Sequence, residues 1–472
     1  MVKRELRVHS DTLRYLFYPR SVAVIGASRY PGKVGYEILE NIIKYGFKGI
    51  VYPVNPKATE ILGLKCYPSV KDIPDEVDLA VICVPAPIVP TIVRECGEKG
   101  VKVLVIISSG FKEVGNVELE RKIVEIASKY GMRILGPNIF GIFCAKSKLN
   151  ATFGPAEVLP GKIALISQSG ALGIALMGWT ISEKIGLSAV VSVGNKADID
   201  DADLLKFFAD DDSTKTIMIY LEGLRRAREF MKVAREVSMK KPIIVIKAGR
   251  SERGAKAAVS HTGAMATDDA IYSAAFKQCG VLRALDLESA LDWARALSEL
   301  KAPEDEGVII ITNGGGIGVM ATDECIERGL KLVDPPQDLM ETMRRHMPPF
   351  GSPLNPVDLT GQATEYEYYG ALVDALTYPL VHAILVLYCE TAIVDPMRVA
   401  ESIIRARENT RVEKPILASL VGGVRSLKAI DYLNSNGIPA YPTVSRAVSA
   451  LDALYEWSRW RAKFKTTVHS PA

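Results

Sequence analysis

Residues 22–46 read VAVIGASRYPGKVGYEILENIIKYG, and this stretch decides the fold class. A run of small and β-branched apolar residues leads into a glycine-rich turn, after which apolar residues recur at helical spacing. Ile38, Ile42 and Tyr45 fall on one helical face, and Gly46 is a typical residue for the end of a helix. The stretch therefore predicts a strand, a tight turn and an amphipathic helix, which together open a βαβ unit.

The same alternation repeats along the rest of the chain. In a first unit, further β-branched runs predict strands at 49–56, 79–85 and 101–108. A second series predicts strands at 162–168, 187–194, 216–223 and 242–249. The polar stretch SELKAPEDEG at 298–307 is a linker candidate, and the run at 308–315 opens a third series. We therefore expect an α/β protein with three consecutive domains, at 1–142, 143–298 and 299–472.

Length and composition agree with that organisation. A chain of 472 residues suggests about three domains of ~150 residues each. We expect a soluble, cytoplasmic protein, because neither a bilayer-spanning apolar run nor a secretion signal is visible. The net charge of +3 is too small to predict nucleic acid or a membrane as partner. The seven scattered cysteines form no C-x-x-C pair, which predicts free thiols rather than disulfides or a zinc site.

The first glycine-rich turn, GASRYPGKVG at 26–35, joins a predicted strand to a predicted helix. Its backbone N–H groups and the helix dipole can receive a phosphate, although a tight turn without a ligand is an equal alternative. A nicotinamide-dependent oxidoreductase fits poorly, because G-x-G-x-x-G is absent and the second strand ends in VNPK rather than in an acidic residue. Asn55 and Lys57 suit a ligand that carries additional phosphate, and Lys33 adds a second cation.

Two further glycine-rich turns occupy the same strand-to-helix position. In ISQSGALG at 166–173, Ser167 or Ser169 can serve a ligand or can be only a helix N-cap. In TNGGGIGVM at 312–320, three successive glycines favour the close approach of an anion to the backbone.

His261 is one of five histidines and lies in AVSHTGAM at 258–265, where small neighbours leave an imidazole accessible. Zinc binding is disfavoured because no second ligand lies at suitable spacing, and a serine hydrolase is disfavoured because SQSGALG does not match G-x-S-x-G. Nucleophilic attack of the imidazole on a phosphoryl group remains as a chemical role for His261. Glu222, at the end of a predicted strand, is a candidate to hold the other ring nitrogen, although a solvent-facing carboxylate is an equal alternative.

Taken together, the motifs resemble the α subunits of the NDP-forming acyl-CoA synthetases, such as ADP-forming acetate–CoA ligases, which are relatives of succinyl-CoA synthetase. The resemblance covers nearly the whole chain, in family order, through GASRYPGKVG, YPVNPK, VPAP, LGPN, SQSGALG, VGNKADIDDADLL, YLEG, KPIIVIKAGRSERGAKAAVSHTGAMA, TNGGGIGVMA and NPVDLTG. It implies an N-terminal Rossmann-like domain that binds coenzyme A, followed by two flavodoxin-like domains of the succinyl-CoA-synthetase type. The last of these resembles the C-terminal part of the succinyl-CoA synthetase β subunit.

The resemblance also implies roles for individual residues. His261 would become a phosphohistidine, with Glu222 orienting its ring. The coenzyme A site would use Gly26, Ser28, Lys33, Val34, Gly35, Asn55, Lys57, Val84, Pro85 and Ala86. Two helix N-termini would face the phosphate, one with Ser167, Gln168, Ser169 and Gly170, the other with Asn313, Gly314, Gly315 and Gly316.

Nothing in the sequence resembles an ATP-grasp nucleotide domain. The resemblance therefore implies a separate ATP-grasp β subunit, which would carry Mg²⁺ with ADP or ATP, in an α2β2 assembly, while no metal site is expected in this chain. One departure is Ile139 in GPNIFG, where family members often have cysteine, and this change can alter the acyl pocket. The alternative functions are a noncatalytic coenzyme A-binding or -sensing protein and, less favoured, an NAD(P)-dependent oxidoreductase.

Overall fold

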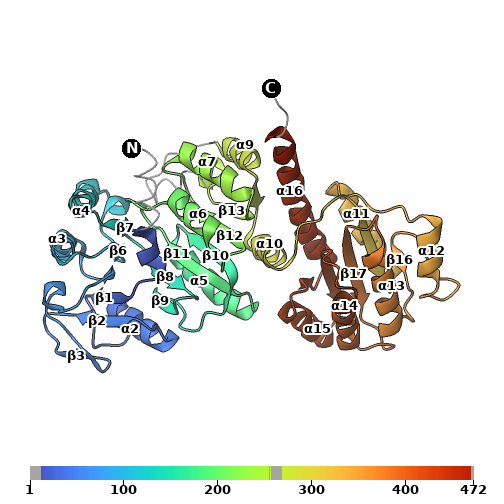
Figure 1. Cartoon of the computed structure of the whole chain (residues 1–472), viewed down its shortest axis with the longest axis horizontal. Helices are drawn as coiled ribbons and strands as arrows, with labels where there is room; N and C mark the ends of the chain where they lie inside the picture. Colours follow the sequence, from blue (N-terminus) through green and yellow to red (C-terminus); the bar gives the residue numbers. More distant parts are fainter. Residues whose placement is uncertain (1–11, 255, 257–267, 469–472) are drawn as a thin grey trace. The chain divides into compact units, whose positions relative to one another are not determined.

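The computed structural model describes residues 12–254, 256 and 268–468 (Figure 1). The chain divides into two compact units, residues 1–284 and 285–472, and each is described by itself. The first unit holds two large sheets and a small two-stranded one, and the second unit holds one large sheet. The α/β class that the sequence predicts is confirmed.

The first sheet is entirely parallel and has the order β2-β1-β5-β6-β7. Ligands bind such sheets at the carboxyl ends of the two strands between which the order reverses, here β1 and β5. The strands are β1 (Ser21–Ile25), β2 (Ile50–Val54), β5 (Leu79–Ile82), β6 (Val103–Ile106) and β7 (Arg133–Leu135), and the helices are α2 (Val34–Tyr45), α3 (Val89–Lys99) and α4 (Val117–Lys129). Shorter elements are β3 (Glu60–Ile61), β4 (Leu64–Lys65) and the 3-10 turns Val70–Asp72, Ala86–Ile88 and Lys112–Val114.

The second sheet has the order β14-β13-β12-β10-β11-β8-β9, and its reversal point lies between β10 and β12. Its parallel strands are β10 (Pro160–Ser167), β11 (Leu187–Ser192), β12 (Thr216–Leu221), β13 (Ile243–Lys247) and β14 (Val281–Ala284). An antiparallel hairpin of β8 (Gly141–Cys144) and β9 (Leu149–Thr152) extends the sheet beyond β11, and the sequence did not predict it. The helices are α5 (Gly170–Ser182), α6 (Asp201–Asp210), α7 (Ala227–Ser238) and α9 (Asp269–Cys279).

The second unit carries a parallel sheet with the order β16-β15-β17-β18-β19, so its reversal point lies between β15 and β17. Its strands are β15 (Val308–Thr312), β16 (Val357–Asp358), β17 (Ala383–Cys389), β18 (Ile416–Val421) and β19 (Ala440–Tyr441). Its helices are α10 (Leu287–Glu299), α11 (Gly315–Glu327), α12 (Gln337–Arg344), α13 (Glu365–Thr377), α14 (Pro396–Thr410), α15 (Val424–Ser435) and α16 (Val444–Val468).

Helix α10 belongs to the second unit, where it packs against α16 (Figure 1). The hydroxyl of Tyr441 donates to the carbonyl of Asp292 at 2.9 Å, and the guanidinium of Arg446 lies 2.7 Å from the carboxylate of Asp292. The domain end that the sequence predicts, residue 298, lies in the last turn of this helix. The domain boundaries themselves stay a prediction.

Burial explains why these segments form strands. All five residues of β1 are buried, as expected for a strand covered on both faces. Helix α2 ends at Gly46, which adopts the left-handed conformation with φ 86°, as the sequence predicted.

All seven cysteines are free thiols. Within the described ranges, no helix combines the length and the apolar character that crossing a membrane requires.

Candidate functional site

A cavity of about 730 Å³ lies within the first unit, where the reversal point of the first sheet meets the N-terminus of α5. It therefore joins the two α/β domains that the first unit contains. The lining residues are Val34, Cys83, Val84, Pro85, Ile107, Ser108, Ser109, Asn138, Ile139, Phe140, Phe153, Gln168, Ser169, Gly170, Ala171 and Ile174.

The turn between β1 and α2 forms one border of this region and requires glycine at both ends. Gly26 has φ 90°, and a Cβ there would lie 2.9 Å from the carbonyl oxygen of Cys83. A Cβ on Gly35 would overlap the carbonyl oxygen of Gly26. No side chain caps the N-terminus of α2, so the backbone N–H groups of its first turn can serve an anion.

Three of the predicted coenzyme A residues line the cavity, namely Val34, Val84 and Pro85. Asn55 instead stabilises the turn: its amide nitrogen donates to the carbonyl of Ala27 at 2.7 Å, and its oxygen accepts from the backbone N–H of Lys57 at 2.8 Å. The remaining predicted residues do not line the cavity. Lys33 and Lys57 are exposed, and Ala86 is buried. The Ser28 hydroxyl accepts from the backbone N–H of Tyr30, and Gly26 and Gly35 shape the turn.

The N-terminus of α5 forms the opposite wall. Ser169 is its N-cap and accepts from the backbone N–H of Leu172 at 3.4 Å. Gly170 begins the helix, and a Cβ built on it meets no atom within 4 Å. Ser167 is fully buried and donates to the carbonyl of Ser169 at 2.7 Å, so its hydroxyl holds the turn rather than facing the cavity. The cavity wall therefore offers the first N–H groups of α5 to an anion.

Glu222 follows β12 at the reversal point of the second sheet and is only 8% exposed. The side-chain oxygen of Gln168 accepts from the backbone N–H groups of Glu222 at 2.9 Å and Gly223 at 3.1 Å. The structure thus ties the Glu222 backbone to a residue of the cavity wall. His261 lies outside the described residues, so its pairing with Glu222 stays a prediction.

A buried ion pair that sequence reasoning missed supports the same turn. Lys196 and Asp201 are each 2% exposed, and the ammonium of Lys196 lies 2.6 Å from the carboxylate of Asp201. The same ammonium donates to the carbonyl of Gly223 at 3.1 Å, and Arg225 donates to the carbonyl of Lys196 at 2.6 Å. A lysine in a polar stretch such as VGNKADIDD gives no sequence signal of burial.

In the second unit, the predicted phosphate residues surround the N-terminus of α11 at the reversal point of the third sheet. The Asn313 side chain is buried and bonds the backbone of Cys389, donating to its carbonyl at 3.0 Å and accepting from its N–H at 2.8 Å. This amide therefore links β15 to β17. Gly314 is the N-cap, a Cβ on Gly315 would lie 3.0 Å from the Asp358 carboxylate, and Gly316 has open space around it. Pairing of this helix end with that of α5 stays a prediction.

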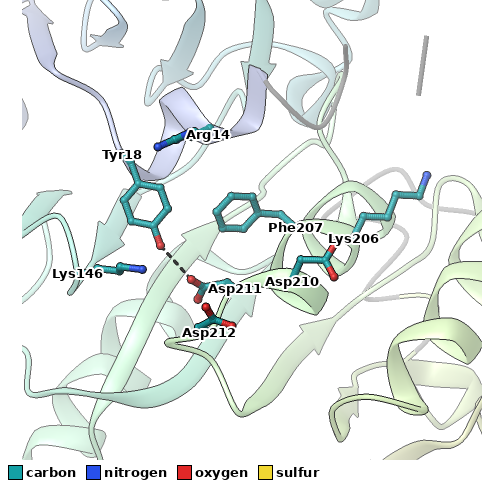
Figure 2. A pocket seen from close by; sticks show the side chains of 8 residues that line it. All are labelled: Arg14, Tyr18, Lys146, Lys206, Phe207, Asp210, Asp211 and Asp212. Atoms are coloured by element: carbon teal, nitrogen blue, oxygen red, sulfur yellow. Dashed lines mark hydrogen bonds between the residues drawn. The ribbon is translucent and has the colours of Figure 1, made fainter. Parts of the chain in front are cut away.

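A second cavity of the first unit, of about 530 Å³, contains none of the predicted site residues. Figure 2 shows the Tyr18 hydroxyl directed at Asp211, to which it donates at 3.0 Å. Two other charged lining groups are engaged in ion pairs, Lys206 with Glu229 at 2.7 Å and Asp210 with Lys240 at 2.8 Å. The lining residues are Arg14, Tyr18, Lys146, Lys206, Phe207, Asp210, Asp211 and Asp212. We therefore place the candidate site in the first cavity.

The lining of the first cavity limits its chemistry. None of the described lining side chains is charged, so an anion there must be held by neutral donors, namely backbone N–H groups, hydroxyls and side-chain amides. Burial raises the pKa of the Cys83 thiol to about 12, which keeps it protonated and unreactive at neutral pH. The cavity is suited to a ligand whose uncharged chain and apolar group lie beside an anion.

Three family models match successive parts of the chain. They are the CoA binding domain over residues 20–145, the succinyl-CoA ligase like flavodoxin domain over 160–297, and the ligase-CoA domain over 308–465. Each match contains the parallel strands of one of the three large sheets, while the β8–β9 hairpin of the second sheet lies outside the match over 160–297.

Individual relatives resemble almost the entire chain. The α subunit of ADP-forming acetate–CoA ligase I from Pyrococcus furiosus is 62% identical over 460 residues, which cover 96% of this chain and 99% of the relative. An ADP-forming acetate–CoA ligase from Methanocaldococcus jannaschii is 46% identical over 455 residues, and the match covers 96% of this chain but 64% of that relative. A solved structure from Ca. Korarchaeum cryptofilum, the dinucleotide forming acetyl-coenzyme A synthetase 1 in complex with phosphate and ADP, has a TM-score of 0.95 at 52% identity, covering 97% of this chain and 99% of that chain.

Proposed function

We propose a function on the premise that the chain belongs to the family of ADP-forming acetate–CoA ligases, as its identity to their α subunits shows. It is the α subunit of an ADP-forming acyl-CoA synthetase, which reversibly converts acyl-CoA, phosphate and ADP into free acid, coenzyme A and ATP. The observation that carries this proposal is the cavity that joins the glycine-rich turn of the first domain to the N-terminus of α5.

In the first step, an oxygen of inorganic phosphate attacks the thioester carbonyl of the acyl-CoA. The carbon–sulfur bond breaks, the sulfur takes up the proton released by phosphate, and an acyl phosphate and coenzyme A result. The N–H groups at Ser169 and Gly170 lie at the positive end of α5, where they hold the negatively charged phosphate in place.

In the second step, a ring nitrogen of His261 attacks the phosphorus of the acyl phosphate. The bond between phosphorus and the acyl oxygen breaks, and the carboxylate leaves. The imidazole becomes cationic as its lone pair forms the new bond, and the Glu222 carboxylate stabilises that charge through the other ring nitrogen. A terminal phosphate oxygen of ADP then attacks the phosphohistidine, which breaks the phosphorus–nitrogen bond and yields ATP.

The nucleotide is proposed to bind on a separate β subunit of the ATP-grasp type, in an α2β2 assembly. The P. furiosus relative is named as an α subunit, and the M. jannaschii relative contains a further segment that this chain does not match. We assign Mg²⁺ to the nucleotide on that partner, because Mg²⁺ is usually bound through one or two carboxylates together with substrate phosphates. A cytoplasmic location accords with the seven free thiols.

The acyl group is proposed to be that of a monocarboxylic acid. A second carboxylate would need a cation in the wall, whereas the described lining is uncharged and contains Ile107, Ile139, Phe140, Phe153 and Ile174. Ile139 is 3% exposed and stands where the family resemblance implied a change in the acyl pocket.

Ile139→Ala is expected to favour longer acyl groups. The shortened side chain leaves room for extra methylenes, so the ratio of kcat/KM for a branched five-carbon acyl-CoA to that for acetyl-CoA should rise about tenfold. Ile142→Ala is the matched control, because Ile142 is fully buried in β8 but does not line the cavity. An unchanged ratio in Ile139→Ala would show that the acyl group binds elsewhere.

The proposal that this chain is phosphorylated while ATP forms only with a partner is tested by supplying acyl-CoA, labelled phosphate and ADP to the purified chain. We expect label on the protein and no ATP until the partner subunit is added. ATP synthesis by this chain alone would contradict the proposed partner. Tight coenzyme A binding without any protein-bound label would favour a noncatalytic sensor instead.

A further inference from the structure

We propose that the ammonium group of Lys247 binds the phosphoryl group at the carboxyl edge of the second sheet. Lys247 is the last residue of β13, which pairs with β12. Its register partner on β12 is Leu221, the residue directly before Glu222. The inference rests on the proposed function, because it requires a phosphoryl group beside Glu222.

The Lys247 side chain is buried, and within the described ranges it has no directly paired anion. It is 7% exposed, its ammonium donates to the carbonyl of Ala248, and it lies 4.6 Å from the ring centre of Tyr272. Among the described residues, no carboxylate oxygen lies within 4.0 Å of it. Burial lowers the pKa of this ammonium. A buried cation in such surroundings costs folding free energy, and such costs are typical of functional sites.

Three charged groups on or next to neighbouring elements act on Lys247: Asp269 of α9, Arg283 of β14 and Glu222, which follows β12. Asp269 is already engaged, because its carboxylate lies 2.5 Å from the guanidinium of Arg283. These two charges largely cancel. Among the described residues, Glu222 is a further charge of opposite sign that acts on the Lys247 ammonium.

An incoming phosphoryl group would be repelled by the Glu222 carboxylate that the proposed mechanism needs. A cation on the next strand offsets that repulsion and attracts the phosphoryl oxygens as charge moves onto them. Lys247 forms no covalent bond in this scheme and transfers no proton. It supplies fixed positive charge, which a methionine of similar length cannot supply.

The test compares Lys247→Met, Lys247→Arg and Lys241→Met in the full chain. Lys241 is the matched control, since it lies just before the opposite end of β13 and donates to the carbonyls of Phe208 and Asp211, both at 2.6 Å. Burial lowers the pKa of the Lys241 ammonium as well. Acetyl phosphate serves as the phosphoryl donor, and labelling rate, a ³¹P titration of the phosphoprotein and the Tm are measured.

We expect the labelling rate of Lys247→Met to be about 100-fold lower than that of the wild type. The proton affinity of the phosphoryl group in this variant should be about tenfold higher. Lys247→Arg should recover most of the rate. The Tm should rise in Lys247→Met, because a buried charge that faces no carboxylate among the described residues is removed. It should fall in Lys241→Met, which loses two hydrogen bonds without losing labelling.

Two results overturn the inference separately from the proposed function. Wild-type labelling rate and wild-type proton affinity in Lys247→Met would overturn the role of Lys247 alone, as would a lowered Tm in that variant with normal labelling. Absence of label from the wild-type chain would overturn the proposed function, and this inference with it.

Discussion

Glu222→Gln is expected to slow phosphorylation of the chain about 100- to 1,000-fold while leaving the fold intact. Glutamine keeps the size of the side chain but removes the negative charge that stabilises the cationic imidazole. The backbone of residue 222 should stay in place, because its N–H and that of Gly223 are both held by Gln168. The measurement is the single-turnover rate of label transfer from acetyl phosphate to the protein.

Glu229→Gln is the control for that experiment. Glu229 is also a carboxylate of the second α/β domain, but it lies on α7, is 36% exposed and pairs with Lys206. Its loss should leave the labelling rate within twofold of wild type, since exposed pairs contribute little. A Glu222→Gln protein that is labelled as fast as this control would remove Glu222 from the mechanism.

Gly35→Ala is expected to destabilise the first α/β domain by about 3 kcal/mol or more and to abolish coenzyme A binding. The added Cβ would overlap the carbonyl oxygen of Gly26, which is backbone and cannot rotate away. Relief requires α2 to move away from β1, and this movement displaces the helix N-terminus and Val34, which lines the cavity. Urea unfolding and calorimetric titration with coenzyme A measure the two effects.

Gly178→Ala is a control for which we expect the opposite change in stability. Gly178 lies inside α5, and a Cβ built there meets no atom within 4 Å. Alanine should therefore stabilise the helix by about 0.5–1 kcal/mol and leave coenzyme A affinity unchanged. Equal stability of the Gly35→Ala protein and the wild type would contradict the packing of the first turn.

The regular elements could be predicted from the sequence because buried parallel strands are continuous apolar runs. Residues 22–25 and 216–221 are of this kind, and both were predicted as strands. The β8–β9 hairpin escaped prediction. Its segments follow GPN and lie close to a Gly/Pro-rich stretch, and β9 carries the polar residues Asn150 and Thr152, which are buried by bonding one another.

The candidate site was predictable in its position more than in its contacts. A glycine-rich turn after a strand indicates where a helix N-terminus will point, and Gln168, Ser169 and Gly170 do line the cavity. Sequence pattern does not reveal which partner a polar side chain chooses. The sequence assigns the amides of Asn55 and Asn313 to ligands, and the structure adds that they bond the backbones of Ala27 and Cys389; their ligand roles stay predictions.

The central claim is that a phosphoryl group passes through His261, and its most direct test is to locate that group. The chain is incubated with acyl-CoA and labelled phosphate, digested at alkaline pH, and its phosphopeptide is sequenced by mass spectrometry. The account predicts one acid-labile, base-stable phosphate on the imidazole of His261, and no such label on His261→Ala. Label of that kind on the His261→Ala protein, or on another residue of the wild type, would contradict it.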